Sequence, residues 1–350
     1  MAYKVLIIGC GAIAGGYDAH RPDDDWPLSH AGAIGRSDAF ELAACVDPDD
    51  AAREAFAARW KPRQSARDLS ALNAAPGDYD LIAVASPTRL HADHLRAAHA
   101  LSPKAVFCEK PLAKDLGAVP ALLDAYERSG VALAVNHTRR WAPDMVDLAR
   151  ATRREGGGEW GDLISAMGVY AKGVVHNGSH MVDLVQMLLG PCDVQSVGRA
   201  LFDHWRDDPS VSAVLERASD ASSVHLIAGD SRAFTQFELV LTFARGEIAI
   251  RDGGMRIETR RRIESPHTAG YWQLGPAYSA AGRYNEAMSA AYDNIAQAIE
   301  AGAPLACDAR RAFEAQSLCE RIRRRALAKT PPPPPDQPLN RSFDRTGSRS

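Results

Sequence analysis

The stretch KVLIIGCGAIAGG, at residues 4–16, sets tighter limits on the fold than any other part of this chain. Its aliphatic run at 5–8 holds no polar residue, which is typical of a strand buried on both faces of a parallel sheet. The run continues directly into Gly9-Cys10-Gly11-Ala12-Ile13-Ala14, which fits the pattern G-x-G-x-x-G/A. That pattern predicts a dinucleotide-binding loop, because glycines allow a sharp turn and let backbone N–H groups approach a pyrophosphate. An ordinary glycine-rich turn between a strand and a helix is the alternative.

Length and composition narrow the class of protein. A chain of 350 residues predicts two domains. The net charge of −3 argues against nucleic-acid binding and against electrostatic attachment to a membrane surface. No apolar run is long enough for a membrane span, and the N-terminal apolar stretch is too short for a signal peptide. The six cysteines show no C-x-x-C pair, which favours reduced thiols, no metal site and a cytoplasmic location.

Strands and helices alternate through the first part of the chain. Helical patterns at 51–60, 89–101 and 119–130 separate the expected strands, which lie at 4–8, 41–47, 79–87, 104–111 and 131–137. The polar segment 17–28 is interpreted as a loop inserted near the start of the first helix. This alternation predicts an α/β fold with an N-terminal Rossmann domain, a doubly wound parallel sheet.

The pattern changes near residue 150. Strands at 162–173 and 193–203 flank a helix at 179–190, and residues 222–264 are rich in strand-forming sequence. We therefore expect a C-terminal α+β domain with a large open, mostly antiparallel sheet, closed by helices at 284–301 and 308–328. The expected domains are 1–120, with core strands continuing to about 137, then 121–330, then a Pro-rich disordered or extended tail at 331–350.

Asp47 ends the second expected strand. A carboxylate at this point can accept hydrogen bonds from both hydroxyls of an adenosine ribose, and no arginine follows directly to neutralise a 2′-phosphate. The residue therefore predicts NAD in preference to NADP. The alternative is that Asp47 only caps the helix that follows.

Seven ordered segments of this chain resemble the Gfo/Idh/MocA family, named for glucose–fructose oxidoreductase, inositol dehydrogenase and a rhizopine-catabolism protein. They are GCGAIAGG (9–16), CVDPD (45–49), LIAVASPTRLHADHLRAAHA (81–100), VFCEKPLA (106–113), RRWAPDM (139–145), GEWGDLI (158–164) and HNGSHMVDLVQMLLG (176–190). The resemblance implies an NAD(P)-binding Rossmann domain and a C-terminal open sheet that mediates oligomerisation. We therefore expect a homodimer or homotetramer formed through strands 222–264.

The resemblance also implies the residues of the site. Besides Gly9, Gly11, Ala12, Ile13, Ala14 and Asp47, the cofactor residues would be Ser86, Pro87, Thr88, His91, Glu109 and Lys110. Lys110 would polarise the reacting oxygen, and His180 would transfer its proton, as imidazole commonly does near neutral pH. A surface lysine and a helix-start histidine are the alternatives. Supporting or substrate-binding roles would fall to His176, Asn177, Asp183, Arg140 and Lys172, with His137 and Arg139 nearby.

One position departs from the family pattern. Many members carry an aspartate four residues before the catalytic histidine, whereas this chain has His176. A neutral imidazole cannot raise the basicity of His180 as a carboxylate would. A metal held by His176, His180 and Asp183 is disfavoured, because Gly178 interrupts the helix and H-N-G-S-H lacks the glutamate of a zincin.

These features predict an NAD-dependent oxidoreductase acting on a secondary alcohol or ketone of a sugar, cyclitol or nucleotide sugar. One alternative is a lyase or glycosidase that keeps NAD tightly bound and oxidises its substrate only transiently. The other is a non-catalytic nicotinamide-binding regulator.

Overall fold

The computed structural model describes residues 2–22, 25–153, 158–334 and 339. The chain forms two compact units, one made of Met1–Pro143 and Tyr284–Glu314 and the other of Asp144–Arg283 and Ala315–Ser350. Sequence analysis placed the boundary at residue 120 and assigned the helix near 284–301 to the second domain. In the structure this helix belongs to the first unit, because it packs on elements of the first sheet.

The first unit contains one parallel sheet. Its strands are β1 (Tyr3–Ile8), β2 (Phe40–Val46), β3 (Gln64–Ala66), β4 (Leu81–Val84), β5 (Ala105–Cys108) and β6 (Ala132–Val135). They are ordered β3-β2-β1-β4-β5-β6, which confirms the predicted doubly wound fold. The central strands are fully buried, as their aliphatic sequences require. The short edge strand β3 was not predicted, since its sequence QSA has no apolar run.

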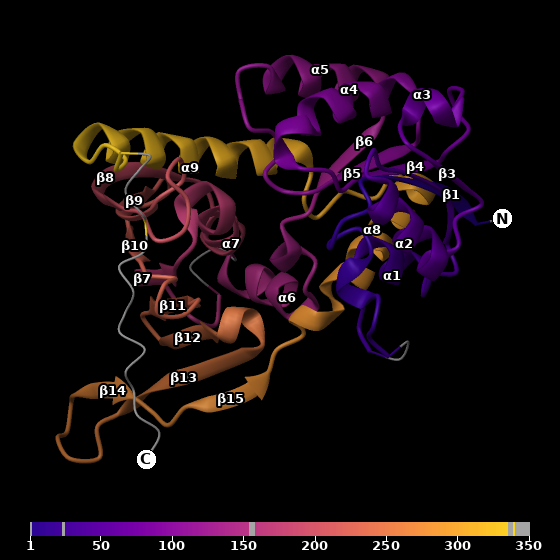
Figure 1. The fold of residues 1–350 in the computed structure, drawn as a ribbon. Coiled ribbons are helices and arrows are strands. Elements are labelled where there is room, and N and C mark those ends of the chain that lie inside the picture. The colour runs from indigo at the N-terminus through magenta and orange to yellow at the C-terminus, as the bar shows by residue number, and fades with distance from the viewer. Residues whose placement is uncertain (1, 23–24, 154–157, 335–338, 340–350) are drawn as a thin grey trace, which may run out of the picture. The chain divides into compact units, whose positions relative to one another are not determined.

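Helices cover both faces of this sheet (Figure 1). They are α1 (His30–Ile34), α2 (Asp50–Trp60), α3 (Leu69–Leu72), α4 (His91–Ala100), α5 (Val119–Ser129) and α8 (Ala287–Ala301). Helices α1, α2 and α8 lie on one face, and α3, α4 and α5 lie on the other. Because the strands are parallel, their carboxyl ends meet at one edge of the sheet, where doubly wound proteins bind their ligands.

The inserted segment interrupts the first helix. The backbone N–H of His30 donates to the carbonyl of Ile13 at 3.0 Å, and that of Ala31 donates to Ala14 at 2.8 Å. Helical hydrogen bonding that begins in the glycine loop is thus resumed by α1 after the insertion. The buried Asp18 carboxylate closes the insertion by accepting hydrogen bonds from Leu28 and Ser29.

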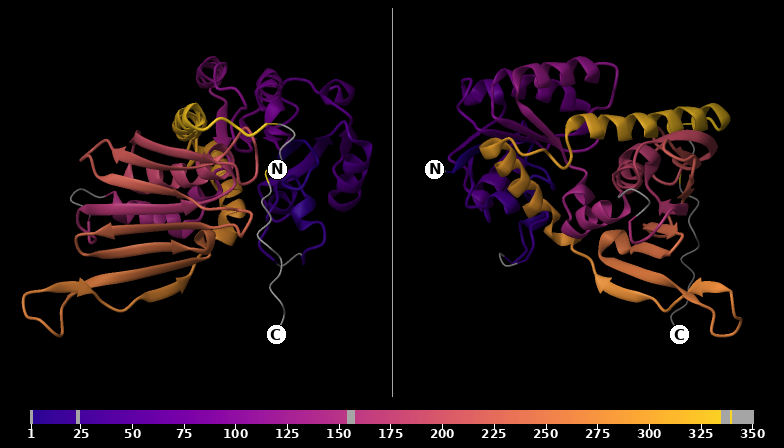
Figure 2. Two further views of the ribbon diagram at one scale, coloured as in Figure 1. Left: turned by 60° about the vertical axis from the view of Figure 1, so that its left-hand side comes forward. Right: turned by 180° about the vertical axis from the view of Figure 1, so that it is seen from behind.

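The second unit contains a mixed, mostly antiparallel sheet. Its strands are β7 (Leu163–Tyr170), β8 (Cys192–Leu201), β9 (Ser210–Arg217), β10 (Ser223–Ala228), β11 (Phe237–Phe243), β12 (Gly246–Arg251), β13 (Arg256–Glu264), β14 (Trp272–Leu274) and β15 (Tyr278–Ala281). The order is β14-β13-β12-β11-β7-β10-β9-β8, with β15 paired to β13. Among the described strands of this second sheet, only β7 and β10 pair in parallel. Figure 2 shows the strands side by side, with β13–β15 at one end.

One face of this sheet is covered and the other is open. Helix α7 (Gly178–Leu189) packs so closely on β7 that a Cβ at Gly168 would lie 2.7 Å from the Met181 sulfur. Met167 and its register neighbours point to the opposite face, where Met167 is 45% exposed and Ile227 is 39% exposed. The remaining helices are α6 (Pro143–Thr152) and α9 (Ala309–Lys329), and α9 begins in the first unit and continues into the second.

No helix among the described residues is both long and apolar enough to cross a membrane.

Of the predicted tail at 331–350, only 331–334 and 339 are described, and the rest of that prediction lies outside the described residues. Arg206 donates hydrogen bonds to the carbonyls of Pro333 and Pro334 at the start of the tail.

Candidate active site

The glycine loop has the geometry that a dinucleotide requires. Gly9 has φ +98°, and a Cβ there would lie 2.8 Å from the backbone of Ala85 and Ser86, so only glycine fits. A Cβ at Gly11 would meet nothing within 4 Å, which leaves its backbone open to a ligand. Ala14 is completely buried, while Ala12 is exposed and Ile13 is partly exposed. The loop therefore fits a pyrophosphate bound at its backbone.

Asp47 connects the second strand to this loop. Its Oδ2 accepts the Cys10 N–H at 2.7 Å, and its Oδ1 accepts the Asp49 N–H at 2.9 Å. Each carboxylate oxygen retains a further lone pair for a ribose hydroxyl. Asp47 thus braces the loop and also presents an acceptor at the carboxyl edge of the sheet.

A pocket of about 430 Å³ opens beside Asp47. Of the predicted cofactor residues, Gly9, Asp47, Ser86 and Pro87 line it; the other lining residues are Ile8, Val46, Pro48, Arg67, Asp68, Leu69, Ser70, Arg89, Leu90 and His94. Sequence analysis missed the two arginines because Arg67 follows the unpredicted strand β3 and Arg89 lies beyond Thr88. Both arginines thus line the pocket that holds Asp47, and Arg67 lies 3.6 Å from the carboxylate of its neighbour Asp68.

His91 supports the loops around this pocket. It is 1% exposed, and its ring nitrogens lie 2.7 Å from the carbonyl oxygens of Pro111 and Ser86. The neighbouring Ser86 hydroxyl lies 2.7 Å from His94 Nδ1. His91 therefore connects the loop after β4 to the loop after β5 through their backbones. Thr88 lies in the short helical turn Thr88–Leu90 that precedes α4.

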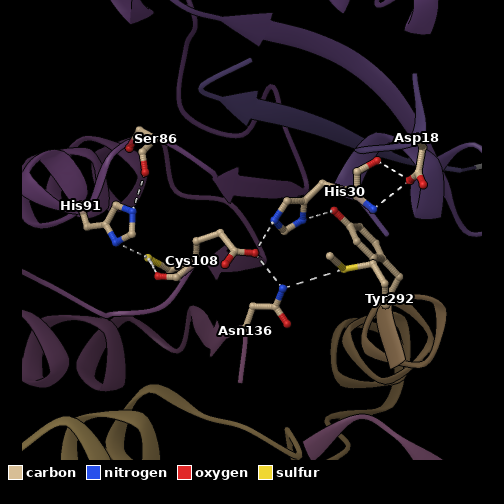
Figure 3. Close-up of polar contacts among 10 residues, drawn as sticks. Asp18, His30, Ser86, His91, Cys108, Asn136 and Tyr292 are labelled. Atoms are coloured by element: carbon tan, nitrogen blue, oxygen red, sulfur yellow. Dashed lines mark hydrogen bonds and ion pairs between the residues drawn. The ribbon is translucent and has the colours of Figure 1, made fainter. Parts of the chain in front are cut away.

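A buried polar network surrounds Glu109, which follows β5 (Figure 3). Its Oε1 lies 3.1 Å from His30 Nε2 and accepts a hydrogen bond from Asn136 Nδ2 at 2.7 Å. His30 Nδ1 lies 3.0 Å from the Tyr292 hydroxyl. Burial alone would raise the pKa of Glu109, but the hydrogen bonds from His30 and the Asn136 amide and the charge of the Lys110 ammonium together lower it. Glu109 is therefore held as a carboxylate.

Three of these network residues were missed by sequence analysis. His30 lies directly after the insertion, Asn136 follows β6, and Tyr292 comes from α8, more than 150 residues further along the chain. The signal available for Asn136 was its position, because it is a polar residue directly after a strand of the parallel sheet. Nothing local in the sequence marks Tyr292.

The basic residues of the first unit lie close to the same edge. Lys110 follows Glu109 directly and is partly exposed. His137, Arg139 and Arg140 are buried in and beside the helical turn Thr138–Arg140 that follows β6. The guanidinium of Arg139 lies 5.0 Å from the Tyr284 ring centroid. The structure thus brings Lys110 and Arg140 to the ends of neighbouring strands.

The other predicted residues belong to the second unit. Lys172 has φ +64°, and its N–H donates to Asp203 at 2.9 Å. A π-helical turn at Gly173–Asn177 then leads into α7, with His176 in the turn and His180 in the first turn of α7. Asn177 Nδ2 donates to the Ala171 carbonyl at 2.8 Å, so that part of its amide supports the turn. Asp183 is 1% exposed on α7.

The loop between β8 and β9 holds this turn in place and was not predicted as part of the site. Asp208 accepts the N–H groups of Val175 at 2.9 Å and His176 at 2.8 Å. Burial raises the pKa of Asp208 to about 6, although these two hydrogen bonds and the Arg323 charge act in the opposite direction. The His176 ring lies 4.4 Å from the ring of Trp205. The sequence HWRDD at 204–208 was the available signal.

Within residues 2–22, 25–153, 158–334 and 339, no group of three or more His, Cys, Asp or Glu residues is placed to hold a metal ion. The fold, the glycine loop and the acidic residue after β2 define an NAD(P)-binding Rossmann protein.

Comparison with known proteins finds a family match for the first part of the chain. Residues 3–137 match the Gfo/Idh/MocA family, described as an oxidoreductase family with an NAD-binding Rossmann fold. The matched residues run from β1 to β6, so the likeness to this family covers the parallel sheet of the first unit.

Relatives cover most of the chain. It is 28% identical to inositol 2-dehydrogenase of Rhizobium meliloti over 300 residues, which are 79% of this chain and 86% of the relative. It is 27% identical to D-apiose dehydrogenase of Paraburkholderia graminis over 280 residues, 75% and 69% of the two chains. A solved 3-ketoreductase mutant from Actinomadura kijaniata, in complex with TDP-benzene and NADP, shares the fold. Its TM-score is 0.69 at 17% identity, over 93% of this chain and 98% of that one.

Proposed function

We propose that this protein is an NAD-dependent dehydrogenase that transfers a hydride between nicotinamide and a secondary alcohol or ketone of a sugar, cyclitol or nucleotide sugar. The observation that carries the proposal is the alignment of residues at one edge of the first sheet. The glycine loop follows β1, Asp47 follows β2, Ser86 follows β4 and Glu109-Lys110 follows β5. A dinucleotide bound there would have its pyrophosphate at the loop and its adenosine ribose at Asp47.

The substrate class is supported by the relatives. One is named for the cyclitol inositol and another for the sugar D-apiose. Both substrates carry several neighbouring hydroxyl groups. A site for such molecules needs charged and polar side chains that can hold hydroxyls, and Arg140, Lys172 and Asn177 are the candidates in this chain.

The acid–base chemistry is assigned to Lys110 and His180. When bound, the nicotinamide accepts or donates the hydride. Lys110, beside the Glu109 carboxylate, would hold and polarise the oxygen on the reacting carbon. His180 would take the hydroxyl proton during oxidation and return it during reduction. Asp183, one turn further along α7, would orient the helix face that presents His180.

The choice between NAD and NADP depends on two opposing features. Asp47 disfavours a 2′-phosphate by charge repulsion, whereas Arg67 and Arg89 line the same pocket and would attract one. We propose NAD because Asp47 directly follows the strand that borders the glycine loop. Its carboxylate accepts a hydrogen bond from the loop at Cys10, which supports a negative charge at the proposed ribose position.

Turnover with a substrate panel tests the proposal. The purified protein is incubated with myo-inositol, D-apiose and a set of nucleotide sugars, with NAD⁺ or NADP⁺, and reduced cofactor is measured by absorbance. Substrates that are turned over should also raise the melting temperature when NAD⁺ is present. Product formation without added cofactor and without net reduction would instead indicate the redox-neutral lyase. Cofactor binding without any turnover would indicate the non-catalytic regulator.

A further inference from the structure

The buried residue His30 makes contacts that the proposed hydride transfer does not explain. It is fully buried, and its ring bridges the Tyr292 hydroxyl and the Glu109 carboxylate at 3.0 and 3.1 Å. We propose that His30 is a positioning residue that fixes one oxygen of Glu109 and thereby presents the other oxygen, beside Lys110, to a hydroxyl group of the bound cofactor. This inference rests on the proposed function.

The geometry of Glu109 is asymmetric. Among the described residues, every side-chain hydrogen bond to Glu109 is made at Oε1, by His30 and by Asn136. The side chain is 11% exposed, while that of His30 is 0% exposed. A carboxylate clamped through one oxygen can rotate little about its last bond. Its second oxygen therefore remains as an oriented acceptor at the carboxyl edge of the sheet.

The insertion after the glycine loop determines where His30 lies. Asp18 accepts hydrogen bonds from the Ser29 N–H at 2.8 Å and the Ser29 hydroxyl at 2.5 Å, and Ser29 in turn caps α1 at Gly32. His30 is the first residue of α1, and its N–H is bonded to Ile13 of the glycine loop. His30 thus joins the loop expected to hold the pyrophosphate to the carboxylate beside Lys110.

The hydrogen-bond partners also determine which groups in this network donate and which accept. Burial and the Glu109 charge raise the pKa of Tyr292 well above its usual value, so its hydroxyl remains protonated. The Tyr292 O–H can then donate to His30 Nδ1, and a ring proton on Nε2 can donate to Glu109. This tautomer is assigned from the partners. Phe107 packs edge-on against both rings at 5.1 and 5.7 Å and holds them in place.

Loss of His30 should act on the charge of Glu109. The groups facing this carboxylate are His30 from α1, Asn136 after β6, Tyr292 from α8, and Cys108 and Lys110 beside it in the chain. Removing His30 takes away the strongest of the interactions that oppose the burial of the carboxylate. The pKa of Glu109 should then rise, and a larger fraction of the protein should hold it protonated below neutral pH.

A double-mutant cycle tests this role, with NADH as the probe and fluorescence titration as the readout. The variants are His30→Ala, Glu109→Gln and the double variant, each titrated from about pH 4 to about pH 8, a range that begins near the ordinary pKa of a carboxyl group. We expect His30→Ala to weaken NADH binding about tenfold, the value of one charge-assisted hydrogen bond, and to move the acid limb of the binding profile up by about one pH unit. In the Glu109→Gln background the same substitution should change affinity less than about twofold.

Matched variants separate positioning from folding. His30→Gln retains a hydrogen-bond donor and should recover part of the affinity. Asn136→Ala removes the second donor to Glu109 Oε1 and should shift the pH profile of NADH binding in the same direction as His30→Ala. This variant replaces His30→Ala in the test if His30→Ala does not fold. His99→Gln replaces a partly exposed histidine of α4 that contacts Ser129, and this variant should bind NADH like the unmodified protein.

Two results would overturn the inference: unchanged NADH binding and pH profile in His30→Ala, or an equal loss in both backgrounds of the cycle. The failure of the proposed function looks different. If the proposed function is wrong, the unmodified protein neither binds NADH nor turns over any polyol. If only the inference about His30 is wrong, the unmodified protein does both, and the coupling between His30 and Glu109 is absent.

Discussion

Replacing Asp208 with asparagine should change how the stability of the second unit depends on pH. The Asp208 carboxyl is buried beneath the turn that carries His176, and burial raises its pKa from 3.8 to about 6. A carboxyl whose pKa is higher in the folded than in the unfolded state stabilises the fold below the unfolded pKa. That contribution is lost as the pH rises through the folded pKa. A shift of about two units corresponds to about 3 kcal/mol.

Asparagine does not titrate, but its NH2 group cannot accept the second of the two backbone N–H bonds, so the comparison uses the change of stability with pH and not the absolute stability. The free energy of unfolding of Asp208→Asn, relative to the unmodified protein, should therefore increase by about 3 kcal/mol between pH 4 and pH 7.5. The assay is urea denaturation at a series of pH values, followed by tryptophan fluorescence. Parallel pH dependences in the two proteins would refute the reasoning, because they would mean that Asp208 is equally ionised in both states.

Four further outcomes are expected. Gly9→Ala, with φ +98° and a Cβ forced against Ala85, should destabilise the fold by about 1–3 kcal/mol and abolish NADH binding, as measured by melting temperature and fluorescence titration. Asp47→Ala should weaken NADH binding more than NADPH binding, and Arg67→Ala should weaken only NADPH binding; equal effects on both cofactors would contradict the assignment of the pocket. His176→Asp should shift the pH–rate profile upward, since a carboxylate raises the basicity of a neighbouring imidazole. Met167→Glu should dissociate the expected dimer or tetramer in light scattering, because Met167 is 45% exposed on the open face of the second sheet, and a monomeric unmodified protein would contradict this.

Sequence reasoning located the parallel sheet well because its evidence is local. The aliphatic runs of β1, β4 and β5 are continuous, and the glycine loop follows β1 directly. The antiparallel strands of the second unit alternate in burial, as in β11, so their period was visible. The short strands β3, β14 and β15 were missed because three or four residues carry little period. Strand β9 was also missed, although it is eight residues long.

The supporting residues of the site were harder to predict because their partners are distant in sequence. His30 is placed by a hydrogen bond to Ile13 across an insertion that Asp18 closes. Its other partners come from β5 and α8. In the second unit, Asp208 reaches back more than 30 residues to the turn at His176. Such contacts depend on how the elements pack, and no local pattern reports them.

The turnover number of Lys110→Ala and His180→Ala, measured across pH beside their affinity for NADH, tests the proposed chemistry most directly. If both side chains act mainly in the transition state, each substitution should lower kcat by about a hundred- to ten-thousand-fold. NADH affinity should change far less. Near-normal turnover in either variant would contradict the assignment of Lys110 and His180 as the acid–base residues.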